Sequence, residues 1–97
     1  MPTYIHLVRF TQKGIENIKE GGTRLDGVKQ AYKAMGAEVN AFYLVMGQYD
    51  GVVIVEAPND EVMAKLSLAG GTRGTVRTET LRAFTEEEYR KIIAALP

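Results

Sequence analysis

Four side chains in this sequence have types and positions that suit the binding of a ligand. His6, the single histidine, could act as a general base or as an axial ligand to haem. Tyr49 and Asp50 place a phenol beside a carboxylate on one turn, where the pair could orient a substrate or hold a proton. Arg77, with Glu79 two residues later, could bind a polar group. We therefore treat these four residues as candidate ligand-binding residues and assign no catalytic residue.

Each of the four also has an ordinary structural explanation. A lone histidine inside a strand is most often a hydrogen-bonded core residue. Asp50 could accept backbone N–H groups of its own turn, and Tyr49 could pack across a hairpin. Arg77 on an edge strand could discourage pairing with other chains, as charged residues there commonly do. The functional and the structural explanations both remain open at this point.

The composition excludes several kinds of site. The chain has no cysteine, which rules out disulfides, thiolate metal sites and cysteine nucleophiles. Spacings typical of metal ligands are missing, so we expect neither a zinc site nor a cofactor. The stretch Gly70–Thr75 contains Arg73 but lacks the lysine and the following helix of a phosphate-binding loop, so we expect a flexible connection there.

Length and charge indicate a single domain over residues 1–97. The 12 Lys and Arg residues balance the 12 Asp and Glu residues and are interspersed with them. The chain therefore has no basic stripe for nucleic acid and no cationic amphipathic helix for a membrane surface. A secretion leader and a long apolar run are also missing. We expect a cytoplasmic protein that binds neither nucleic acid nor membranes.

The first half of the chain predicts a strand followed by an interrupted helix. Tyr4–Phe10 is rich in aromatic and branched residues, as strands are. Residues 15–35 carry apolar side chains at helical spacing. Gly21–Gly22 predicts a break or kink in this helix, because each glycine costs a helix about 1 kcal/mol relative to alanine. Gly36 is expected to end the helix.

The centre of the chain predicts a β-hairpin. Ala37–Met46 and Val52–Ala57 are the two strands, and Gly47–Gly51 is the turn between them. The Asp50–Gly51 pair is a strong hairpin signal, because both residues tolerate the positive φ of a tight two-residue turn.

The second half predicts a helix, a strand and a terminal helix. Asn59 is expected to cap the first of these helices and Gly70–Gly71 to close it. Thr75–Phe84 is the expected strand. Thr85 and Glu88 have the spacing of a capping box, which opens a last helix. Its apolar face consists of Tyr89, Ile92, Ile93 and Leu96.

The element order β-α-β-β-α-β plus a terminal helix predicts an α+β, ferredoxin-like fold. Right-handed crossovers place both main helices on one face of a four-stranded antiparallel sheet. We expect the other, free face to carry Tyr4, His6, Val8 and Phe10, opposite Ile5 and Leu7. An exposed apolar face marks an interface or a groove. We therefore expect a homodimer that packs two free faces together, with the terminal helix locking it.

The sequence resembles the GYD domain family, small and mostly bacterial proteins named for a Gly-Tyr-Asp signature. Gly47, Tyr49 and Asp50 match the signature within MGQYDGVVIVEAP. The resemblance extends to TYIHLVRFT, AFYLVMG and VRTETLRAFTEEEYRKII, and so covers nearly the whole chain. It implies a dimeric α/β barrel of the ferredoxin-like type and supplies no activity. His6 is not carried over from the family.

Three functions fit these observations. We rank first an oligomeric protein that binds a small apolar or aromatic molecule. The second is a cofactor-independent monooxygenase or isomerase of the dimeric α/β-barrel type, whose cavity holds His6, Tyr49 or Asp50. Such enzymes need few catalytic groups, so a sparse set of motifs does not exclude them. The third is a purely structural or interaction module.

Overall fold

The structure is a computed structural model that describes residues 1–97. Its elements, in chain order, are β1 (Thr3–Phe10), α1 (Gln12–Glu16), the 3₁₀ turn η1 (Ile18–Glu20), α2 (Gly21–Ala34), β2 (Glu38–Leu44), β3 (Gly51–Glu56), α3 (Asp60–Thr72), β4 (Val76–Ala83) and α4 (Glu86–Ala94). No helix is both long and apolar enough to cross a membrane.

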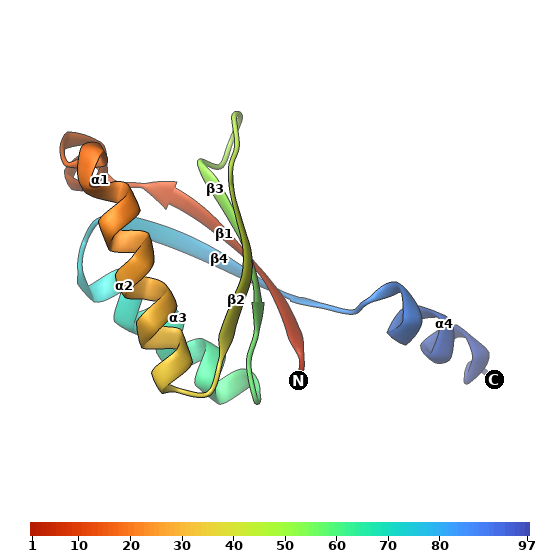
Figure 1. Cartoon of the computed structure of the whole chain (residues 1–97). Helices are drawn as coiled ribbons and strands as arrows, with labels where there is room; N and C mark the ends of the chain where they lie inside the picture. Colours follow the sequence, from red (N-terminus) through yellow and green to blue (C-terminus); the bar gives the residue numbers. More distant parts are fainter.

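The strands form one antiparallel sheet in the order β2-β3-β1-β4. Both α2 and α3 lie on the same side of this sheet (Figure 1). The helix α2 packs along β2, and α3 packs along β4, so each helix covers an edge of the sheet. This arrangement is the ferredoxin-like β-α-β-β-α-β fold, and the predicted fold class is confirmed.

The predicted assignment of the two sheet faces is wrong for β1. The residues expected on the free face lie under the helices instead, and these are Tyr4, His6, Val8 and Phe10. Ile5 and Leu7 lie on the free face. Both faces of β1 carry mainly apolar residues. The sequence pattern therefore divides the residues between two faces but does not tell which face the helices cover. Tyr4 and His6 can be buried because their polar atoms find partners in Asp60 and Thr80.

Two predicted helix boundaries are also wrong. The first helical segment breaks at Asn17, which leaves the helical region with φ −110° and ψ 28°, and Gly21–Gly22 begin α2. Gly70–Gly71 lie inside α3, which ends just before Gly74. A helix ends at a glycine where the backbone needs positive φ, and Gly74 has φ 76°. Gly36, with φ 78°, ends α2 as predicted.

The central hairpin is confirmed, but its connection is longer than a two-residue turn. Residues 45–50 join β2 to β3, and the Val45 N–H donates to the Asp50 carbonyl oxygen at 2.9 Å. Positive φ occurs in this loop only at Gly47, where φ is 121°. Asp50 keeps an ordinary backbone conformation, because it extends the pairing between β1 and β3 rather than forming a tight turn.

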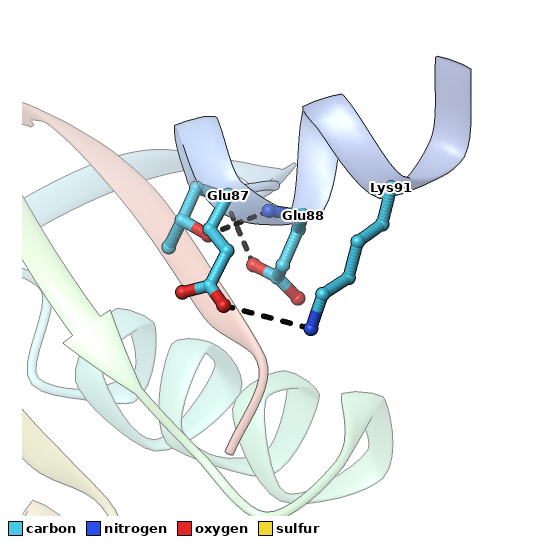
Figure 2. A network of polar contacts seen from close by, with 4 residues as sticks. Glu87, Glu88 and Lys91 are labelled. Atoms are coloured by element: carbon cyan, nitrogen blue, oxygen red, sulfur yellow. Dashed lines mark hydrogen bonds and ion pairs between the residues drawn. The ribbon is translucent and has the colours of Figure 1, made fainter. Parts of the chain in front are cut away.

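The terminal helix α4 projects away from the sheet and from the other helices (Figure 1). Its capping box is confirmed: the Glu88 N–H donates to Thr85 Oγ1 at 3.2 Å, and the Thr85 N–H donates to Glu88 Oε1 at 2.9 Å. Figure 2 shows this cap and the Glu87–Lys91 ion pair, 3.5 Å long, on the helix surface. With this arm the chain has a radius of gyration of 14.6 Å, against about 12.5 Å for a compact chain of the same length.

Candidate functional site

A cavity of about 370 Å³ lies between α2, α3 and the sheet. The two helices pack along opposite edges of the sheet, so the side chains of the central strands β1 and β3 form its floor. Its lining is mainly apolar and includes Phe10, Tyr32, Phe42, Val53 and Leu66. The volume is at the lower end of the range for small-molecule pockets, roughly 300–1,000 Å³.

His6 lies in this lining and is only 5% exposed. Its Nδ1 lies 2.8 Å from Thr80 Oγ1, which in turn lies 3.2 Å from Ser67 Oγ. Ser67 gives its single hydroxyl hydrogen to the Met63 carbonyl oxygen at 3.0 Å, so Thr80 must donate to Ser67. The Thr80 hydroxyl can then only accept a hydrogen bond from His6. With all three contacts hydrogen-bonded, the proton of His6 lies on Nδ1 and Nε2 is a hydrogen-bond acceptor.

The surroundings of His6 keep its ring neutral. Burial lowers the pKa of His6 below its ordinary value of 6.5, because a buried imidazolium loses its hydration. Its Nε2 has no hydrogen-bond partner in the chain and is not sealed off by protein atoms. The cavity floor thus presents one unpaired acceptor among apolar side chains.

Arg24 and Arg73 line the same cavity. The sequence pattern does not point to Arg24, and it points to Arg73 only within a stretch that lacks the features of a phosphate-binding loop. Arg24 lies in a helical segment, and Arg73 lies in a stretch expected to be a flexible connection. A signal was nevertheless present, because the tetrapeptide Gly-Gly-Thr-Arg occurs twice, at residues 21–24 and 70–73. The two copies come from α2 and from the end of α3 and meet at the cavity.

The carboxylate of Asp50 is used by the backbone of β1. Its Oδ2 accepts the Phe10 N–H at 2.8 Å, and the Asp50 N–H donates to the Val8 carbonyl oxygen at 2.8 Å. The last regular β1–β3 pair is Val8 with Gly51, so Asp50 continues the pairing with its side chain beyond the end of β3. This bond differs from the turn cap that the sequence suggested, because it joins segments about forty residues apart.

Tyr49 is fixed at one end of the free sheet face. Its hydroxyl donates to Glu79 on β4, and the Arg9 guanidinium lies 4.7 Å from its ring centroid. Arg9 Nε also donates to the Gln48 carbonyl oxygen at 2.8 Å. The hydrogen bond to Glu79 raises the pKa of Tyr49, because it is made by the protonated phenol. These contacts hold the hairpin loop against β1 and β4.

The four candidate residues do not form one site. His6 lies in the cavity under the helices, whereas Tyr49 contacts side chains of the free face and Asp50 binds the end of β1. Arg77 is exposed and lies opposite Arg9 in the β1–β4 register. No three His, Asp or Glu side chains gather closely enough to hold a metal ion.

Asp50→Ala is expected to destabilise the fold. The substitution leaves the Phe10 N–H without its acceptor, and hydrogen bonds to charged groups contribute about 1.5–3 kcal/mol. Tyr49→Phe is the matched control at the neighbouring residue. It removes the hydrogen bond of an exposed hydroxyl group, so it should lower the free energy of unfolding less. Urea unfolding measures both free energies. Equal losses in the two variants would contradict this role of Asp50.

Stability is expected to fall as the pH drops below about 6.5. The folded-state pKa of His6 is lowered, so in this range the unfolded chain binds more protons than the folded chain. The stability that His6 contributes is therefore fully present above its unfolded pKa and declines toward the lower, folded pKa. His6→Gln keeps a hydrogen-bonding side chain without this titration. In thermal melts from pH 7 downward, Tm should fall less steeply with pH for the variant than for the native protein. Equal slopes of Tm against pH would refute this role of His6.

Comparison with known proteins finds a protein family, a similar protein and a similar solved structure. The family model of the GYD domain matches residues 4–93. A Thermus thermophilus protein named glutamine synthetase and cystathionine beta-lyase binding protein is 38% identical over 85 residues, which cover 87% of this chain and 90% of that protein. The crystal structure of TTHA0845, also from Thermus thermophilus, is 29% identical, with a TM-score of 0.55, and covers 88% of this chain and 95% of that chain. The loop carrying Gly47, Tyr49 and Asp50 is thus part of a match that spans nearly the whole sequence, and this chain belongs to the GYD domain family.

Proposed function

We propose that this protein is a homodimeric binding protein whose partners are other proteins. The observation that carries the proposal is the large apolar surface that the single chain leaves uncovered. The accessible surface of the whole chain, polar and apolar together, is 6774 Å², roughly 1,300 Å² more than a compact monomer of this mass exposes. A typical specific interface removes about 800 Å² from each partner. The excess is therefore sufficient for a stable contact between two chains.

The free sheet face has an apolar centre. Its register places seven apolar side chains together on this face: Ile5, Leu7, Ala41, Tyr43, Val52, Ile54 and Leu81. The helices α2 and α3 both lie on the other side of the sheet and leave this face uncovered (Figure 1). An apolar patch of this extent is unusual on a monomer and favours an interface.

Charges at the two ends of the free face favour a second copy as the occupant. Arg9 and Arg77 lie opposite one another at one end of the strands, and Glu38 and Glu56 are paired at the other end. Two such faces that pack with their strands running in opposite directions bring each arginine end against a glutamate end. The same surface is then complementary to itself, as a two-fold interface requires.

The projecting α4 supplies a second apolar surface. Phe84, Tyr89, Ile92, Ile93 and Leu96 are each at least 45% exposed on or beside this helix. An amphipathic helix is stabilised mainly by packing its apolar side. We assign that packing to the second chain, which α4 reaches because it stands away from its own sheet.

Protein partners are supported by the relative from Thermus thermophilus, which is named as a binding protein for two enzymes. We extend this type of activity to the present chain. We place the protein in the cytoplasm, because its lack of cysteine fits a reducing compartment.

Ile54→Lys is expected to convert the dimer into a monomer, because it inserts a charge at the centre of the free face. Leu68→Lys is the matched control: Leu68 is 72% exposed on α3, on the opposite side of the sheet. Light scattering after size exclusion measures the mass of each. We expect a dimer for the native protein and for Leu68→Lys. A native protein that is monomeric would refute the interface.

The native protein is expected to bind at least one of two purified enzymes, glutamine synthetase or cystathionine beta-lyase, taken from the organism that makes this chain. Biolayer interferometry should give saturable binding that a metabolic enzyme of similar mass does not show. Failure of both enzymes to bind would contradict this choice of partners. It would not contradict the proposed dimer.

A further inference from the structure

The cavity under the helices is not explained by the proposed dimer or by protein partners. It lies on the opposite side of the sheet from the free face, so packing of two free faces leaves it open. Its size suits a molecule with about one ring. Three features of its lining indicate the chemistry of such a molecule.

The first feature is an uncompensated positive charge. Arg24 and Arg73 line the cavity, and no Asp or Glu is among its lining residues. The ion pairs of the chain lie on α4, so neither arginine is neutralised by a carboxylate. Arg24 is held in place by the Asn17 and Gly14 carbonyl oxygens, at 2.8 and 3.4 Å. A guanidinium has five N–H donors, so donors remain for an anion.

The second feature is room left by glycines inside helices. Gly21, Gly22 and Gly70 line the cavity, and a Cβ at any of them would meet no heavy atom closer than 4.0 Å. None of the three has positive φ. Neither backbone conformation nor close packing within the chain therefore requires glycine here, although glycine lowers helix stability relative to alanine. At these three positions the space beside the helix is open, and it belongs to the cavity.

The third feature is the acceptor on the cavity floor. His6 Nδ1 carries the proton in its hydrogen bond with Thr80 Oγ1, and this leaves the lone pair of Nε2 without a partner in the chain. Because Nε2 is not sealed off by protein atoms, it can accept a hydrogen bond from a molecule in the cavity. A hydroxyl or N–H group of a ligand satisfies it.

We propose that this cavity binds a small aromatic carboxylate that also carries a hydroxyl or N–H group. The ring lies among the apolar side chains, the carboxylate binds Arg73 and Arg24, and the hydroxyl or N–H group donates to His6 Nε2. The proposal names a ligand site and no reaction.

Three related probes test the chemistry of the ligand by isothermal titration calorimetry with the native protein. The first, 3-(4-hydroxyphenyl)propionate, has the anion, the ring and the donor. We expect it to bind at least tenfold more tightly than 3-phenylpropionate, which lacks the donor, or 3-(4-hydroxyphenyl)propionamide, which lacks the charge. Equal affinities for the three probes, or no saturable binding of the first, would overturn the proposal.

Paired variants test the location of the site. Gly70→Leu should fill the cavity and abolish binding, whereas Gly71→Leu places the same side chain on the same helix outside the lining and should bind normally. Arg73→Gln should weaken binding at least tenfold, and Lys29→Gln, which removes the same charge from an exposed position outside the lining, should change it less than twofold. Unchanged binding in Gly70→Leu would place the probe elsewhere and refute the site.

His6→Leu tests the acceptor separately. It should remove the preference for the hydroxylated probe over 3-phenylpropionate while leaving the affinity for 3-phenylpropionate within threefold. Retention of the tenfold preference would refute the role of His6. The ligand site is also independent of the proposed dimer, so the monomeric Ile54→Lys variant should bind the first probe as the native protein does.

Discussion

Two helices can cover one face of a four-stranded sheet and not both, and this chain carries apolar side chains on both faces. The rest of the structure depends on this imbalance. The covered face obtains its core from α2 and α3, while the apolar side chains of the other face stay uncovered in the single chain. The apolar side of the projecting α4 is uncovered as well. A chain of 97 residues therefore has surface that its own fold cannot bury.

The GYD loop contributes to this arrangement as a structural clamp. Asp50 binds the backbone at the end of β1, and Tyr49 binds Glu79 on β4. The loop after β2 is thereby tied to the two strands on the far side of β3 in the sheet order. We infer that the signature residues fix the end of the sheet, so that the faces on either side keep their shape. The ligand site that we propose lies among other residues, in the cavity.

Much of the fold could be predicted from the sequence, because strands, caps and the element order leave local signals. Thr85 with Glu88 and Gly36 are examples. The sheet faces could not be assigned in this way: Tyr4 and Ile5 are both compatible with burial, and only the hydrogen bonds of Tyr4 and His6 to distant residues decide between them. Arg24 and Arg73 could not be identified as neighbours in one cavity for a related reason, since they come together only in the folded chain.

The central claim is that a second chain covers the free face and packs against α4. Isotope-filtered nuclear Overhauser spectra of a mixture of labelled and unlabelled protein test it most directly. We predict contacts between chains that involve Ile54 or Leu81 on the sheet and Ile92 or Ile93 on α4, with no such contacts at Leu68 on α3. Spectra without any contact between chains at the sheet face, at concentrations where the protein is fully folded, would contradict the account.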